Sequence, residues 1–144
     1  MAILGPSNLR QLLLRDHERL EALFEELLEV FREGHQCEIR TLWTDFESGL
    51  IAHFAFEERF LLPLFAEGDP AEAAALRAEH ARFCSTVAEL GVGVDLHLVP
   101  LDLAHELIEA LRAHARREDE VLYRWAEREV APEGPGAPLD SPEA

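Results

Sequence analysis

Residues 39–57 read IRTLWTDFESGLIAHFAFE, and the apolar side chains of this stretch recur at alternating steps of four and three. That spacing predicts an amphipathic helix, because residues three or four apart lie on the same face. The next two positions of the apolar stripe hold His53 and Glu57 instead of apolar side chains. Burying an imidazole or a carboxylate without a partner is unfavourable. The stretch therefore predicts both a helix and a polar site on its buried face.

Three further segments repeat this pattern. One apolar stripe runs through residues 13–31, another through 73–90 and a third through 104–125. Each stripe is interrupted by one or two polar side chains where an apolar one is expected. The polar positions on the four stripes are His17, His53, Glu57, His80, His114 and Glu118. Six such side chains on inner faces are most simply explained as a metal site.

Start and stop signals divide the chain into four helices. Gly34 ends the first, Pro63 ends or kinks the second, and Asp69-Pro70 starts the third. The expected helices cover about 7–33, 37–62, 70–93 and 100–129. Long helices joined by short connections are typical of bundles. The sequence therefore predicts an all-α fold, an antiparallel up-down-up-down four-helix bundle.

The bundle topology allows a separate check on the six polar positions. Counted along helices that alternately rise and descend, they fall within about six residues of one height, or roughly 9 Å at 1.5 Å per residue. Periodicity places the six groups on inner faces, and topology independently places them at one level.

The composition excludes several classes of protein. The formal charge of −16 argues against binding to nucleic acid or to an anionic membrane surface, because both need a basic face. No segment has the roughly 20 consecutive apolar residues of a membrane span, and no secretory signal is visible. We expect a cytoplasmic protein whose domain covers residues 7–130. Residues 131–144 form an acidic tail rich in proline and glycine, for which the composition predicts disorder.

The two cysteines, Cys37 and Cys84, are isolated in the sequence. On the second and third predicted helices their heights differ by roughly 18 Å at 1.5 Å per residue, which is too far for a disulfide. We expect two free thiols, both buried as small apolar side chains.

The motif His-x-x-x-Glu occurs twice, once in the second helix and once in the fourth. A spacing of four places both side chains of a motif on one face, one turn apart. A carboxylate between two metals can bridge them through its two oxygens, and each imidazole can supply a terminal nitrogen. Two bridging glutamates and two histidines per metal leave room for a small exogenous ligand. Nitrogen and carboxylate donors without thiolate suit iron, with manganese or zinc as weaker alternatives.

The remaining histidines lie off the apolar stripes. His35 falls in a loop, His97 in a linker and His105 one position beside a stripe, so we expect surface or capping roles. The Glu-x-x-His motif of ferritin-like bundles is absent, because Arg77 and Leu111 occupy its acidic position. The zinc-protease motif His-Glu-x-x-His is absent as well.

The pattern closely resembles the hemerythrin-like, HHE cation-binding family. The resemblance extends from about Asn8 to Glu129. It is carried by the motifs Asp16-His17-Glu18, His53-x-x-x-Glu57-Glu58 followed by Pro63, Ala78-Glu79-His80, and His114-x-x-x-Glu118. The family implies an antiparallel four-helix bundle around two iron ions joined by an oxo or hydroxo bridge. By the same resemblance, the four histidines are terminal ligands, and Glu57 and Glu118 are bridges.

One departure concerns a fifth histidine, which the oxygen-carrying hemerythrins have one turn from the ligand in the third helix. Leu76 and Cys84 stand at the corresponding positions here. The chain therefore resembles the four-His, two-Glu subgroup, in which a more symmetric centre would expose both irons. Cys84 and Glu79 are the other side chains that could reach the site.

The resemblance implies a small non-haem di-iron protein that binds O2 or a related diatomic as a carrier, store or sensor. One alternative is a di-iron redox enzyme acting on peroxide or nitric oxide in stress defence, since the fifth histidine is missing. Another is an iron-sensing or iron-supply module. An apolar wall one layer above the six groups would suit a diatomic, and it consists of Leu20, Leu50, Phe83 and Leu111. The oligomeric state is left open.

Overall fold

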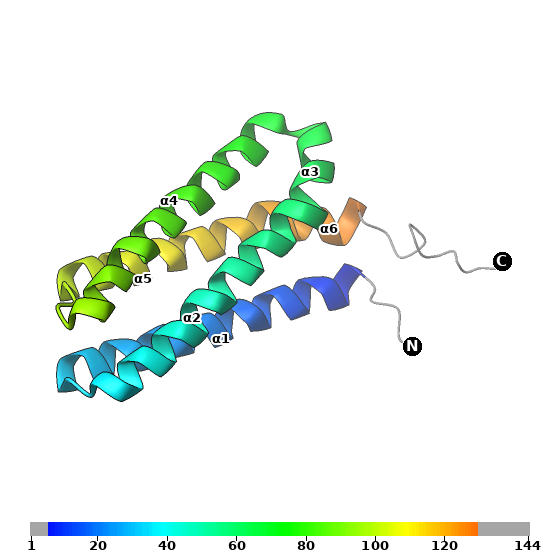
Figure 1. The fold of residues 1–144 in the computed structure, drawn as a ribbon. Coiled ribbons are helices and arrows are strands. Elements are labelled where there is room, and N and C mark those ends of the chain that lie inside the picture. The colour runs from blue at the N-terminus through cyan, green and yellow to red at the C-terminus, as the bar shows by residue number, and fades with distance from the viewer. Residues whose placement is uncertain (1–5, 130–144) are drawn as a thin grey trace.

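The computed structural model describes residues 6–129, and all regular structure in this range is helical (Figure 1). The longest elements are α1 (Pro6–Glu33), α2 (Gln36–Phe56), α4 (Pro70–Leu96) and α5 (Leu101–Arg117). The shorter ones are η1 (Glu57–Leu61), α3 (Leu62–Gly68), η2 (Glu118–Tyr123) and α6 (Arg124–Glu129). The predicted all-α class is confirmed, and the predicted tail at 131–144 lies outside the described residues.

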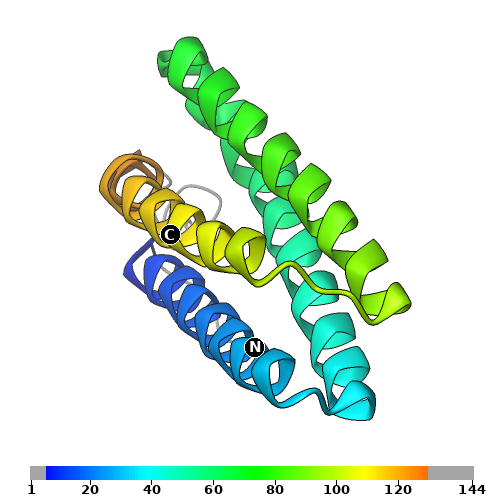
Figure 2. The same cartoon turned by 90° about the vertical axis from the view of Figure 1, so that its left-hand side faces the viewer.

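The long helices form a bundle in which each one packs against two others. Helix α1 contacts α2 and α5, and α4 contacts the same two helices. Figure 1 shows the α1–α2 turn and the α4–α5 connection at one end of the molecule, and α3 with the start of α1 at the other. Figure 2 shows α1 beside α5 and α2 beside α4. None of the described helices combines the length and the apolar character needed to cross a membrane.

Two apolar clusters form the core. The larger cluster includes Leu20, Phe24, Leu50, Phe83, Val87 and Leu107. The smaller one includes Leu13, Leu61, Leu76, Leu122 and Tyr123. On every long helix the predicted polar positions fall between residues of the two clusters, as His17 does between Leu13 and Leu20. Each fully buried leucine contributes roughly 1.5–3 kcal/mol, so apolar packing on both sides holds the polar layer in place.

The helix that begins with α2 does not end at Leu62, as predicted, but continues to Gly68. The π-helical turn η1 separates α2 from α3, and Figure 1 shows α3 as a bent continuation of α2. Pro63 lies in the first turn of α3, where a missing N–H is tolerated because the first amides of a helix have no partner within it. Pro63 therefore marks a kink, the other effect expected of it.

The turn η1 also shifts the buried face, so the last part of the predicted stripe is wrong. Phe60 and Leu64, both on that stripe, are 53% and 48% exposed. The residues buried in their place are Leu61, Leu62 and Phe65. A π-helical turn inserts an extra residue, and every position beyond it moves to a neighbouring face.

The same shift occurs in the last helix at η2. Val121 and Trp125, on the predicted stripe, are only partly buried. Leu122, Tyr123 and Ala126 are buried instead. Periodicity that assumes 3.6 residues per turn cannot detect such a shift.

Helix α4 extends beyond the two glycines at which the sequence predicts its end. A Cβ at Gly93 would lie 2.7 Å from the carbonyl oxygen of Leu98, so this glycine permits close packing of the following loop. The helix ends at His97, whose φ of 60° is left-handed, a common helix end. The predicted start is confirmed, because the Asp69 side chain accepts a hydrogen bond from the amide of Glu72 at 3.1 Å.

The cysteines are free, as predicted, but the prediction that they are buried is wrong. Cys37 and Cys84 are both exposed. Cys37 precedes the first stripe residue of its helix by two positions, and Cys84 follows the buried Phe83 by one. Neither position faces the core.

Candidate metal centre

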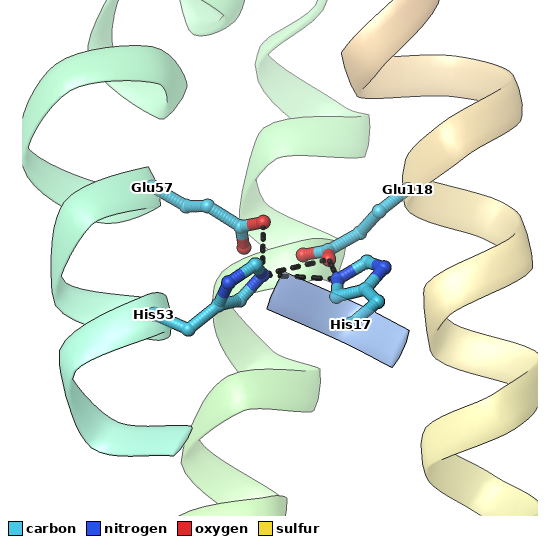
Figure 3. A group of neighbouring side chains, drawn as sticks. All are labelled: His17, His53, Glu57 and Glu118. Atoms are coloured by element: carbon cyan, nitrogen blue, oxygen red, sulfur yellow. Dashed lines mark hydrogen bonds and ion pairs between the residues drawn. The ribbon is translucent and has the colours of Figure 1, made fainter. Parts of the chain in front are cut away.

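The polar layer contains two groups of side chains whose ligand atoms converge. The first group consists of His17, His53, Glu57 and Glu118 (Figure 3), with one ligand atom of each within 4.8 Å of the others. His17 Nε2 lies 2.9 Å from His53 Nε2 and 3.1 Å from Glu118 Oε1. His53 Nε2 lies 2.8 Å from Glu57 Oε2. Helix α1, the consecutive segments α2 and η1, and segment η2 therefore meet at one point.

The second group consists of Glu57, His80, His114 and Glu118, and its four side chains are buried. His80 Nε2 lies 3.2 Å from Glu57 Oε1 and 2.9 Å from Glu118 Oε2. His114 Nε2 lies 2.8 Å from the same oxygen of Glu118. The structure thus brings together all six residues that the sequence analysis selects.

The two groups share both glutamates, and each glutamate faces the groups with different oxygens. Glu57 directs Oε2 toward His53 and Oε1 toward His80. Glu118 directs Oε1 toward His17 and Oε2 toward His80. Both carboxylates are 0% exposed. A carboxylate that presents one oxygen to each of two neighbouring sites has the arrangement required of a bridge between two cations.

Two buried atoms of the second group lack a hydrogen bond. They are Glu57 Oε1 and His114 Nε2, although the second lies close to Glu118. Buried polar atoms in native proteins are nearly always satisfied, and a cation in the second group would satisfy both. Imidazole nitrogens combined with carboxylate oxygens suit a first-row metal ion. The residues therefore fit a pair of metal ions, one for each group.

A family model for the hemerythrin HHE cation-binding domain matches residues 8–126. The chain belongs to the hemerythrin family. Neither the comparison with curated proteins nor the comparison with solved structures found a match. The two groups of histidines and glutamates are compatible with the four-His, two-Glu subgroup of hemerythrins. The family predicted from the sequence motifs is confirmed, and it is a family of cation-binding domains.

Three carboxylates outside the centre of this hemerythrin domain orient its histidines. Each accepts a hydrogen bond from Nδ1 of one imidazole, which leaves Nε2 directed at the shared glutamates. The pairs are His53 with Asp16 at 2.7 Å, His80 with Glu58 at 2.8 Å and His114 with Glu79 at 2.5 Å. His17 differs, because its Nδ1 is buried without a hydrogen bond.

These three carboxylates are adjacent in the sequence to residues of the centre, yet each bonds to a histidine of another helix. Glu79, for example, directly precedes His80 but bonds to His114 on α5. The sequence leaves open whether Glu79 reaches the site and assigns no role to Asp16 or Glu58. An acid beside a predicted position is a signal that could have identified them. Only packing shows which imidazole each acid contacts.

Mutual contacts shift the pKa values of the central groups of this hemerythrin domain. Burial lowers the pKa of His53, but hydrogen bonds to Asp16 and the two shared glutamates outweigh it and raise the pKa to about 11. Burial also lowers the pKa of His80, and its bonds to Glu118 and Glu57 raise it to about 10. The hydrogen bond from His53 lowers the pKa of Asp16 to about 2. Metal binding at these histidines must therefore displace protons.

We expect Glu79→Ala to weaken metal binding by about 10- to 100-fold, the usual effect of losing a carboxylate that orients a metal-bound histidine. Glu79 holds His114 Nδ1 and also pairs with Arg117, so its loss frees the imidazole to rotate. Competition with a chelator measures the change. Glu89→Ala, at an exposed position of the same helix, is the matched control. Equal losses in both variants would contradict this role.

Two aromatic residues of the centre have no role in the sequence-based prediction. Phe54 stacks on the His80 ring, with centroids 4.0 Å apart and an interplanar angle of 12°, and so restrains the plane of that ring. Tyr123 is 0% exposed, and its hydroxyl donates to Glu57 Oε2. Burial, followed by the charges of Glu57 and Glu118, raises the pKa of Tyr123. Both aromatic residues lie beside the predicted stripes, so the periodicity does not predict that they are buried.

A small, mainly apolar cavity of about 50 Å³ adjoins the centre. Its lining includes His17, His53 and His114, together with Leu20, Leu50 and Leu111. Phe83, the fourth residue of the predicted apolar wall, is not part of this lining. It packs against the His114 ring instead, with centroids 5.1 Å apart. A space of this size accommodates a diatomic molecule or a few waters.

The other candidate ligands lie outside both groups. His35, His97 and His105 are exposed, in agreement with the surface or capping roles expected of them. Cys84 is exposed as well and belongs to neither group among the described residues. The position of Cys84 therefore gives no support to a thiolate ligand.

Proposed function

We propose that this hemerythrin-family protein holds two iron ions in a non-haem centre and binds O2 or a related small diatomic as a carrier, store or sensor. The observation that carries the proposal is the sharing of Glu57 and Glu118 between two groups of ligand atoms. In the proposed centre, the two histidines of each group would hold one iron, and Glu57 and Glu118 would contribute to both. The nitrogen and carboxylate donors support iron, and manganese or zinc less well.

The side chains around the centre favour a small nonpolar ligand. Bound iron would supply redox activity and an open position for that ligand. The cavity of about 50 Å³ lies beside the histidines, and its surface is mainly apolar, with Leu20, Leu50 and Leu111 in its lining. The charged side chains in the lining, Glu21 and Arg112, are paired with each other. The apolar part of the lining disfavours strongly hydrated molecules, because these would lose water there without gaining polar contacts.

Contacts among the side chains around the centre support tight metal binding. Asp16, Glu58 and Glu79 each hold one imidazole by Nδ1. Phe54 stacks on the His80 ring. Because these side chains need little further ordering, less conformational entropy is lost when metal binds.

A second candidate function, a redox enzyme acting on peroxide or nitric oxide, is favoured by the surroundings of His80. The positions one turn away on α4 are Leu76, which is buried in the apolar core, and Cys84, which is exposed. Neither supplies the additional histidine of the oxygen carriers. An iron held by the second group would therefore have fewer protein ligands than its counterpart in the oxygen-carrying hemerythrins. It would bind reactants more readily.

Stopped-flow mixing of the reduced, iron-loaded protein with O2 discriminates between these functions. Carriage predicts an optical change that reverses fully when O2 is removed, with no net consumption of O2. Steady consumption of O2, peroxide or nitric oxide over many turnovers would support the enzyme instead. Failure to bind iron would overturn both functions.

Three finer expectations accompany this proposal. The alternation of helix connections between the two ends in Figure 1 supports an antiparallel up-down-up-down bundle. The family match over 8–126 supports a domain close to the predicted range 7–130. The charge of −16 argues against nucleic-acid and anionic-membrane partners, and we expect a cytoplasmic protein.

A further inference from the structure

The hydroxyl of Tyr123 lies among the ligand atoms of the first group. Its Oη is 2.9 Å from His17 Nε2 and 3.1 Å from His53 Nε2. It is 3.2 Å from Glu118 Oε1 and also contacts Glu57 Oε2. The side chain is fully buried. No comparable hydroxyl contacts the histidines of the second group among the described hydrogen bonds.

The number of these contacts exceeds what hydrogen bonding allows. A phenolic hydroxyl donates one hydrogen bond and accepts at most two, whereas Tyr123 Oη has four polar neighbours. These four atoms belong to His17, His53, Glu57 and Glu118, the four residues of the first group. A cation held by these four side chains would therefore lie close to the Tyr123 hydroxyl.

The distances fit neighbouring ligands of one ion. Two donors at right angles, each roughly 2.1 Å from a first-row metal, lie about 3.0 Å apart. The separations of Tyr123 Oη from His17, His53 and Glu118 are 2.9, 3.1 and 3.2 Å. The hydroxyl therefore has the spacing of another coordinating atom.

The π-helical segment η2 directs the Tyr123 side chain toward the first group. Glu118 and Tyr123 are five residues apart, and in a regular α-helix they would point about 140° away from each other. The π-helical segment η2 begins at Glu118 and ends at Tyr123, so both side chains face the centre. Such π-helical turns occur frequently at functional sites.

We propose that Tyr123 is an additional metal ligand, binding through Oη as a phenolate to the ion held by His17 and His53. This proposal rests on the proposed di-iron centre. The phenol proton passes to solvent as the oxygen–metal bond forms, and no electron is transferred. Ferric iron accepts phenolate ligands in other proteins. The two irons then differ, with five protein ligands on the first and four on the second, in place of the symmetric centre implied by the resemblance.

Resonance Raman spectroscopy of the ferric protein tests the proposal without an activity assay. Tyr123 is the only tyrosine in the chain, so a phenolate signal has one possible source. Metal-free protein is loaded with ferrous iron without oxygen and then oxidised. We expect a visible charge-transfer band from phenolate to ferric iron, and ring vibrations that shift when the protein contains ring-deuterated tyrosine.

Two variants accompany this measurement. Tyr123→Phe should keep about two irons per chain but lose the band and the ring vibrations. Trp125→Phe, which changes a partly buried aromatic residue of α6, should keep both. The isotope experiment on the wild-type protein decides the question even where Tyr123→Phe fails to fold. Two bound irons without phenolate vibrations would overturn the ligand role and leave the di-iron function standing. Absence of iron would overturn both.

Discussion

Replacing Glu118 by alanine should remove nearly all of the bound metal. The two oxygens of Glu118 face different groups, Oε1 toward His17 and Oε2 toward His80. Loss of this carboxylate removes a ligand atom from both groups at once, whereas loss of a histidine affects one group. We expect the metal content to fall from about two irons per chain to well below one, measured by plasma emission after anaerobic loading with ferrous iron.

Glu120→Ala is the matched control for this experiment. Glu120 belongs to the same segment, η2, but is exposed, so the variant should bind the full amount of iron. Breaking the buried contacts of Glu118 costs roughly 3–5 kcal/mol, and circular dichroism is needed to show that the variant still folds. Full metal content in folded Glu118→Ala would contradict a bridging role for this residue.

Removing the metal from the wild-type protein should lower its thermal stability. The carboxylates of Glu57 and Glu118 are buried together, and two cations between them would relieve their mutual repulsion. A ligand that binds only the native state stabilises it by about 4 kcal/mol at a thousandfold excess over its Kd. For a domain of this size the midpoint of unfolding then shifts by roughly 10–20 °C.

Calorimetry of the chelator-treated and reloaded protein measures this shift. Reloading with ferrous iron should restore the higher midpoint. The midpoint of Glu118→Ala should change little with chelator, because that variant has little metal to lose. An unchanged midpoint in the wild-type protein would show that the polar layer is stable without metal. It would also remove the physical basis of an iron-sensing role, which requires metal-dependent folding.

The buried faces of the straight helices could be predicted from the sequence. In α1 and α4 the apolar residues of the predicted stripes are buried, and His17 and His80 lie between them. These helices keep 3.6 residues per turn, so a repeat of three and four stays on one face along their whole length. The same repeat identifies the six polar positions, because a buried imidazole or carboxylate needs a partner.

The outer carboxylates could not be assigned in this way. Asp16 is next to His17 in the sequence, but its hydrogen bond is to His53 on α2. The rotation and spacing of neighbouring helices determine which imidazole each acid contacts. Neither can be predicted from a single sequence. The sequence therefore indicates that acids stand near the centre, and the packing of helices selects their partners.

The π-helical turns are the second feature that the sequence did not predict. Periodicity predicts Phe60 and Trp125 in the core, yet η1 and η2 move the buried face to Leu61 and Tyr123. The sequence alone was enough to determine the helical class, the family and the six central residues, because these follow from a regular repeat and from the chemistry of buried charge. The tertiary structure decided the helix kink, the partner of each acid and the burial of Tyr123. Each of these depends on an irregular turn or a contact between helices that is stable only when the whole bundle is packed.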